Sequence, residues 1–184
     1  GVHAGGGAGG EGGVDDSRDV ARRAARSGGG EGQGQVGADV GAGGNDKRLF
    51  LNQREANADF MAMMKNFGGR LGAAVVHCFT GAREELFDYL DRDWHIGITG
   101  WLCDERRGRH LRELVPSIPA HRLMIETDAP YLLPRTLKPM PKDRRNEPMF
   151  LPHIVAELAR DRGETPEATA QATPATAAAV FGVS

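Results

Sequence analysis

An apolar run that ends on two acids and is then broken by proline constrains this chain more than any other stretch. The run, LMIETDAPYLLP at residues 123–134, has the length of a buried strand, with Glu126 and Asp128 where the strand would end. In a parallel sheet such a strand delivers its last polar side chains to the carboxyl edge, where α/β folds keep their chemistry. Asp128 is therefore our first candidate for a catalytic residue. An aspartate that only caps the following turn is the open alternative.

A strand-then-helix rhythm repeats from residue 49 onward. The pattern predicts strands at 49–51, 73–79, 96–99 and 123–127, and helices at 55–67, 83–90, 105–115, 150–161 and 166–181. Strands that alternate with helices of about ten residues pair in parallel through right-handed crossovers. The predicted fold class is therefore α/β, with four βα units.

The beginning of the chain differs in composition from the rest of its 184 residues. Residues 1–44 hold 17 of the 26 glycines and, outside a short helix predicted at 15–26, show no helical or strand periodicity. Such a segment buries too little apolar surface to offset the entropy of ordering it. We predict a disordered, Gly-rich tail over residues 1–45 and one folded domain over residues 46–184.

Charge and cysteine usage narrow the class of protein. A formal net charge of -2 provides no basic excess for non-specific binding to nucleic acid. A run of arginines, Arg106, Arg107 and Arg109, is expected to be a solvated helix face.

Cys78 and Cys103 lie in apolar surroundings without a CxxC spacing, as is typical of reduced thiols. Because no apolar run reaches 18 residues, we expect a soluble, cytoplasmic protein.

Polar side chains stand at the ends of the predicted strands. His77 ends the second strand and Asp128 the fourth, while Asn52, Arg54 and Thr99 lie at or just past the ends of the other two. An imidazole and a carboxylate on one rim are suitable ligands for a divalent cation. A catalytic metal normally has at least three protein ligands, however. A core histidine with satisfied hydrogen bonds is therefore the alternative at position 77.

Four segments of the folded domain carry a more specific pattern: VHCFTG at 76–81, IGITGW at 96–101, ETDAPYL at 126–132 and RRNEP at 144–148. In order and spacing they resemble the C-terminal half of the TatD family of metal-dependent deoxyribonucleases. The resemblance spans about residues 47–184. It implies a partial (β/α)8 TIM-type barrel, amidohydrolase-like, with about four C-terminal βα units.

The resemblance also implies a function and the residues that perform it. The implied activity is hydrolysis of phosphodiester bonds in DNA, at ends or in single strands, with divalent metal, expected to be Mg²⁺. His77 matches a metal ligand, and Asp128 matches an aspartate that binds metal and helps to activate the attacking water. Arg54, Asn146 and Glu147 match positions implied to contact substrate or to shape the rim of the site. For Asn146 and Glu147, a loop held by its own hydrogen bonds is an equal alternative.

Two departures from the family pattern leave a second function open. Asn52 stands where the family has a histidine, and an amide oxygen is a poorer ligand than imidazole. The motifs of the family's N-terminal half, including a carboxylate that bridges two metals, do not occur in this sequence. The alternative is a truncated, catalytically impaired family member with an incomplete metal site and only a binding role. A hydrolase with another substrate is disfavoured by the density of nuclease-type motifs. Open barrel edges also predict self-association.

Overall fold

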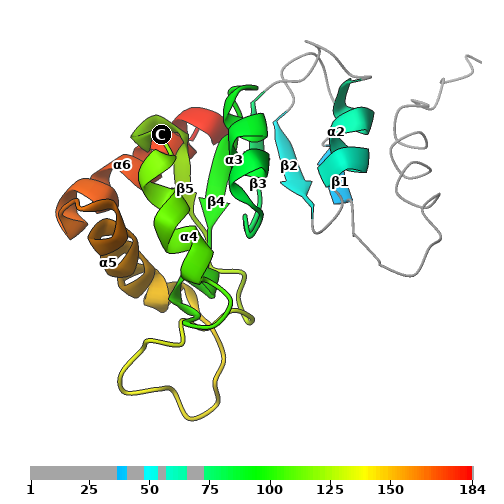
Figure 1. The fold of residues 1–184 in the computed structure, drawn as a ribbon. Helices are drawn as coiled ribbons and strands as arrows, with labels where there is room; N and C mark the ends of the chain where they lie inside the picture. Colours follow the sequence, from blue (N-terminus) through cyan, green and yellow to red (C-terminus); the bar gives the residue numbers. More distant parts are fainter. Residues whose placement is uncertain (1–36, 41–47, 54–56, 66–72, 184) are drawn as a thin grey trace, which may run out of the picture.

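A five-stranded sheet forms the centre of the protein in this computed structural model, which describes residues 37–40, 48–53, 57–65 and 73–183 (Figure 1). Its strand order is β1-β2-β3-β4-β5. Four strands run parallel: β2 (Leu49–Asn52), β3 (Ala74–Val76), β4 (His95–Ile98) and β5 (Leu123–Ile125). The predicted α/β class, with four parallel strands in chain order, is confirmed.

The remaining strand, β1 (Gly37–Val40), pairs antiparallel with β2. The sequence predicts disorder here, so the prediction does not hold for these four residues. An edge strand is held by main-chain hydrogen bonds, which need no alternation of apolar side chains and so leave little trace in composition. Residues 1–36 and 41–45 of the predicted tail lie outside the described residues.

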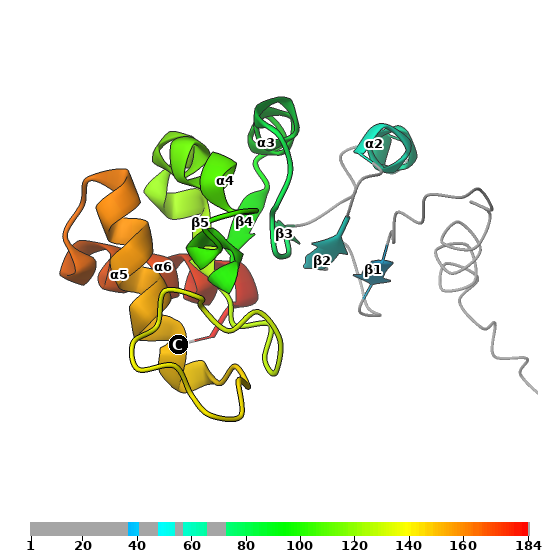
Figure 2. The same ribbon diagram turned by 60° about the horizontal axis from the view of Figure 1, so that its bottom comes forward.

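Helices connect and cover the strands. In the described part of the chain the α-helices are α2 (Asn57–Lys65), α3 (Arg83–Leu90), α4 (Arg109–Leu114), α5 (Leu151–Arg162) and α6 (Pro166–Phe181). Short 3₁₀ turns are η2 (Gly100–Cys103), η3 (Val115–Ser117), η4 (Ala120–Arg122) and η5 (Pro148–Phe150). Figure 2 shows α2, α3 and α4 in a row along one side of the sheet. None of the described helices has the length and apolarity needed to span a membrane.

The third helix begins later than the sequence predicts. The Asp104 carboxylate accepts hydrogen bonds from the main-chain N–H groups of Arg106 (2.9 Å) and Arg107 (3.1 Å). An aspartate that bonds main-chain groups two and three residues ahead stabilises a turn in place of a helix. Arg106 and Arg107 therefore precede α4, which starts at Arg109, and the prediction of one helix face for these arginines is wrong.

The two faces of the sheet are buried by different partners. Alternate strand residues, such as Leu51, Val76 and Ile98, belong to the main apolar core together with side chains of α2, α3 and α4. On the opposite face Val75 and Met124 pack with Val180, near the end of α6. In Figure 1 this red end of α6 lies at the other end of the sheet from the long yellow loop that follows β5. Helix α6 thus covers part of the face that a closed barrel would enclose.

Arg162 ties the end of α5 to the segment that precedes β5. Its side chain is 6% exposed, and Nη1 donates to the main-chain carbonyls of Val115 (2.6 Å) and Ile118 (2.7 Å). Its Nη2 pairs with Glu164 at 2.7 Å. Both Val115 and Ile118 are buried; the Val115 carbonyl also accepts the N–H of Ile118 at 3.2 Å, whereas the Ile118 carbonyl depends on Arg162.

Replacing Arg162 with methionine should therefore lower the free energy of unfolding by roughly 2–4 kcal/mol, because two buried carbonyls each lose a charged donor and the Glu164 carboxylate loses its partner. Urea titration followed by far-UV circular dichroism measures the change. Arg160→Gln is the control, since Arg160 is 57% exposed and pairs with Glu157 and Asp161 of its own helix. The control should change stability by less than about 0.5 kcal/mol. Equal losses in both variants would contradict the structural role of Arg162.

Candidate metal-binding site

His77, Glu126 and Asp128 meet at the carboxyl edge of the sheet. His77 directly follows β3, and Glu126 directly follows β5. The Nδ1 atom of His77 lies 2.8 Å from Oε2 of Glu126, and Nε2 lies 3.6 Å from Oδ1 of Asp128. The imidazole therefore stands between two carboxylates, with one ring nitrogen toward each.

Gly97 makes this meeting sterically possible. Strand β4 lies between β3 and β5 in the sheet, so the Glu126 side chain has to cross it to reach His77. A Cβ atom added to Gly97 would lie 2.4 Å from the carboxyl carbon of Glu126, well inside van der Waals contact. The Glu126 carboxylate therefore occupies the space that a side chain at position 97 would fill.

The main chain bends sharply on both sides of the imidazole. Cys78 has φ 48° and Asp128 has φ 54°, both in the left-handed region that residues other than glycine rarely adopt. The bend at Cys78 points its N–H at Oε2 of Glu126, 3.0 Å away. Strained backbone of this kind persists where surrounding contacts hold it, and it clusters at functional sites.

These contacts determine which nitrogen of His77 carries a proton. Oε2 of Glu126 already accepts the N–H of Cys78, so Nδ1 is assigned as a second donor to this carboxylate. In the neutral ring, Nε2 then presents its lone pair toward Asp128. The hydrogen bond to Glu126 is the main cause that raises the pKa of His77, the burial of the ring opposes it, and the charges of Glu126 and Asp128 raise it further.

The donor set suits one divalent cation better than two. A histidine that donates one N–H to a carboxylate and faces outward with its other nitrogen is a common arrangement of metal ligands. His77 Nε2 and Asp128 Oδ1 fit two positions of such a shell, with water filling others, as Mg²⁺ tolerates. The described residues contain no group of three or more His, Cys, Asp or Glu that could hold a metal ion. The set therefore does not fit a two-metal centre.

Asn146 holds the loop that carries Asp128. Its side chain is 2% exposed, and Nδ2 donates to the main-chain carbonyls of Thr127 and Tyr131, the latter at 2.7 Å. Its own N–H donates to the carbonyl of Pro130 at 3.0 Å. These bonds match the loop-stapling role that the sequence left open for Asn146, and contact with substrate stays a prediction.

Other residues singled out in the sequence have different surroundings. Arg54 lies outside the described residues, so its phosphate contact stays a prediction. Asn52 ends β2 with an exposed side chain, and Glu147 is exposed as well. Thr99 is buried, and its hydroxyl oxygen accepts the N–H of Trp101 at 3.3 Å, at the start of η2. Its hydroxyl also lies 3.3 Å from Sγ of Cys78, so Thr99 makes structural contacts.

Sequence reasoning predicted His77 and Asp128 but missed Glu126 and Gly97. A usable signal was present, because Glu126 and Asp128 are two positions apart at a strand end, and such residues tend to point to the same side. Gly97 carried no comparable signal. A glycine inside a predicted strand indicates a close approach without identifying what approaches.

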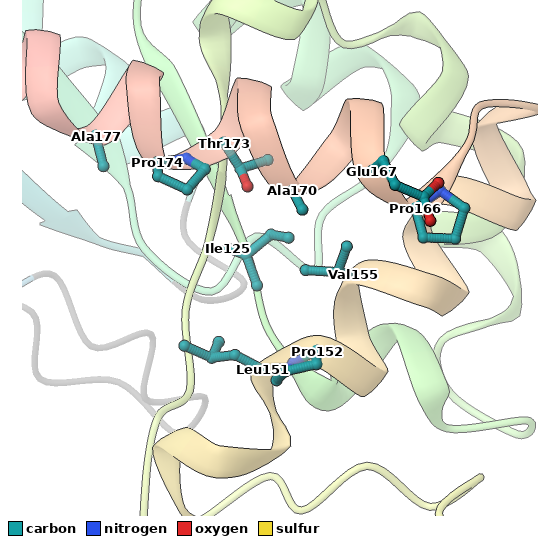
Figure 3. A pocket seen from close by; sticks show the side chains of 10 residues that line it. All are labelled: Ile125, Leu151, Pro152, Val155, Pro166, Glu167, Ala170, Thr173, Pro174 and Ala177. Carbon is teal, nitrogen blue, oxygen red and sulfur yellow. The ribbon is translucent and has the colours of Figure 1, made fainter.

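An apolar groove of about 510 Å³ lies elsewhere, between β5, α5 and α6. Figure 3 shows Ile125 and Val155 facing side chains of α6 across it. Glu167 and Thr173 are the polar residues among its lining, and no histidine lines it. Apart from the Glu167 carboxylate, this apolar lining offers no charged ligand for a cation, unlike the edge that carries His77, Glu126 and Asp128.

Comparison with known proteins places this chain in a family. Residues 42–182 match the family described as TatD related DNase. The 3'-5' ssDNA/RNA exonuclease TatD of Citrobacter rodentium is 53% identical over 135 residues, which are 73% of this chain and 51% of that protein. This chain thus spans about half the length of that relative.

Solved structures agree with the partial barrel. The crystal structure of a hydrolase TatD family protein from Entamoeba histolytica superposes with a TM-score of 0.65 at 26% identity, over 74% of this chain and 51% of that one. The TatD homologue of Escherichia coli K12 gives a TM-score of 0.65 at 23% identity, over 74% and 51%, and it supports the fold alone. The predicted partial TIM-type barrel is confirmed. With its family match over residues 42–182, this chain belongs to the TatD-related DNase family.

Proposed function

We propose that this protein is a metal-dependent nuclease that hydrolyses phosphodiester bonds of DNA, at ends or in single strands. One observation carries the proposal: Glu126 holds His77 so that Nε2 lies 3.6 Å from Oδ1 of Asp128 at the carboxyl edge of the sheet. The name of the Citrobacter rodentium relative, a 3'-5' ssDNA/RNA exonuclease, supports the class of substrate.

In this proposal His77 and Asp128 bind the cation, and Glu126 orients His77. His77 would hold a divalent cation, with Mg²⁺ the first candidate, through Nε2, and Asp128 would hold it through a carboxylate oxygen. A bound cation supplies a water of lowered pKa and offsets charge on the phosphate oxygens. Glu126 keeps the proton on Nδ1, which leaves Nε2 as the ligand atom. The other oxygen of the Asp128 carboxylate would accept a proton from the attacking water.

A second candidate function is binding without hydrolysis. It is favoured by the small donor set, because His77 and Asp128 provide two ligands within the described residues and Asn52 stands where the family has a histidine. Two ligands hold Mg²⁺ weakly, since this cation keeps much of its water. Metal affinity and strand cleavage, measured separately, distinguish the two functions.

We also propose a cytoplasmic location and self-association for this protein. Cys78 and Cys103 are buried and lie outside any disulfide, and burial raises the pKa of Cys103 to about 11, which makes it a poor nucleophile. Reduced, inert cysteines support a cytoplasmic location. Among the described strands β5 pairs with β4 alone, and this open edge supports self-association.

Removal of either ligand should weaken metal binding and stop cleavage. Isothermal titration with Mn²⁺ is expected to show binding that weakens at least about tenfold in His77→Ala and Asp128→Ala, because each removes one of two protein ligands. Cleavage of labelled single-stranded DNA should stop with chelator. His121→Ala is the control, since His121 is exposed in η4. Cleavage that persists in chelator or in Asp128→Ala would contradict the proposed function.

Disturbing the support of His77 should weaken the site without removing a ligand. Glu126→Gln and Gly97→Ala should each lower Mn²⁺ affinity roughly 10- to 100-fold, the first by removing the charge behind Nδ1 and the second by displacing the carboxylate. Glu85→Gln is a matched control, because the Glu85 carboxylate also accepts a main-chain N–H, that of Ala82, at 2.7 Å. Unchanged affinity in both test variants would show that Glu126 does not orient the ligand.

A further inference from the structure

A hollow of about 580 Å³ opens next to the turn that carries Asp128. Its polar and aromatic lining consists of Trp101, Asp104, Arg107, Tyr131, Arg135 and Arg144, and we call it the arginine pocket. The N–H of Tyr131 donates to the carbonyl of Asp128 at 2.8 Å. The wall of the pocket and the metal-binding edge are thus parts of one turn.

Asp104 aligns two of the arginines. Its side chain is 5% exposed, and Oδ2 accepts Nε–H of Arg107 (3.0 Å) and lies 3.2 Å from Nε of Arg135. Burial acts to raise the pKa of Asp104, but hydrogen bonds from Arg107 and Arg106 outweigh it, so the pKa is lowered and the carboxylate stays charged. One buried anion therefore anchors two guanidinium groups that are far apart in the sequence.

Both anchored guanidinium groups keep their outer edges available. The side chains of Arg107 and Arg135 are 53% and 58% exposed, and their Nη atoms make no hydrogen bond to another residue in the described ranges. Arg107 also lies over the ring of Trp101, 4.4 Å from its centroid. An arginine held by Nε and by an aromatic face has lost much of its rotamer freedom before a ligand arrives, which lowers the cost of binding.

The charge of the arginine pocket favours an anion. Three arginines face one aspartate among the lining residues, although the whole chain has a formal net charge of -2. Planar guanidinium groups match the oxygens of a phosphate in pairs. A phosphate group is therefore a suitable ligand for Arg107 and Arg135.

Tyr131 adds a surface for an aromatic ring. Its side chain is 72% exposed at the edge of the pocket, which is unusual for a residue that normally buries its ring. Unpaired nucleobases stack on such exposed rings, with little dependence on sequence. A phosphate site and a stacking ring on one turn match the alternation of phosphate and base along a single strand.

We propose that the arginine pocket is a nucleotide subsite for single-stranded DNA, in which Arg107 and Arg135 bind a backbone phosphate and Tyr131 stacks on a base. The inference rests on the proposed nuclease function and adds a site that binds the DNA strand next to the site that hydrolyses it. Arg107, predicted from the sequence to be a solvated surface charge, is here a residue that binds substrate.

Binding measured without metal tests the subsite separately from hydrolysis. Fluorescence anisotropy of a labelled oligothymidylate in EDTA at low salt should show roughly tenfold weaker affinity for Arg135→Gln and a salt slope smaller by about 0.7, the value for one lost phosphate contact on a single strand. Tyr131→Ala should lose about tenfold, and Tyr131→Phe should retain the affinity because it keeps the ring. Arg160→Gln is the matched control, since Arg160 is 57% exposed and also pairs with carboxylates.

The outcomes separate the subsite from the nuclease activity. Weaker binding in Arg135→Gln and Tyr131→Ala, with normal binding in Arg160→Gln and Tyr131→Phe, supports the subsite even if no strand is cut. Absence of binding, or equal binding by all variants, overturns the subsite and leaves metal-dependent cleavage to its own test. A duplex of the same length that binds as tightly as the single strand also overturns it, because paired bases cannot stack on Tyr131.

Discussion

The hydrogen bond between His77 and Glu126 is the interaction on which the site depends. It joins residues 49 positions apart in the chain and crosses a whole strand, which is possible because Gly97 has no side chain. By occupying Nδ1, Glu126 turns Nε2 toward Asp128. One carboxylate thus selects the tautomer, and the other completes a pair of ligand atoms for a divalent cation.

Two buried polar side chains hold the loops around this pair of ligand atoms. Asn146 binds the carbonyls on both sides of the turn after β5. In the neighbouring arginine pocket, Asp104 pairs with Arg107 and Arg135. Both supporting residues are buried polar groups that bond in several directions, an arrangement that rigidifies what it supports. Asn146 thus holds the turn that carries Asp128, and Asp104 holds the two arginines, whereas Glu126 and Gly97 position His77.

Much of the fold could be predicted because its determinants are local. Each parallel strand is an apolar run of a few residues, and α3 and α6 have the bounds that the sequence predicted. Two features could not be predicted in this way. Strand β1 relies on main-chain pairing with β2, and α4 starts late because the Asp104 side chain competes with helical bonding. Side-chain periodicity records neither effect.

The sequence by itself determined the order of βα units, the family, and the two residues His77 and Asp128 at strand ends. Only the tertiary structure decided that Glu126 reaches His77 over Gly97, that α6 packs on the inner face of the sheet, and that Arg107 faces a pocket. The physical reason is common to all three. Strand and helix patterns depend on neighbours along the chain, whereas these contacts depend on which strands lie side by side and on where a side chain is missing.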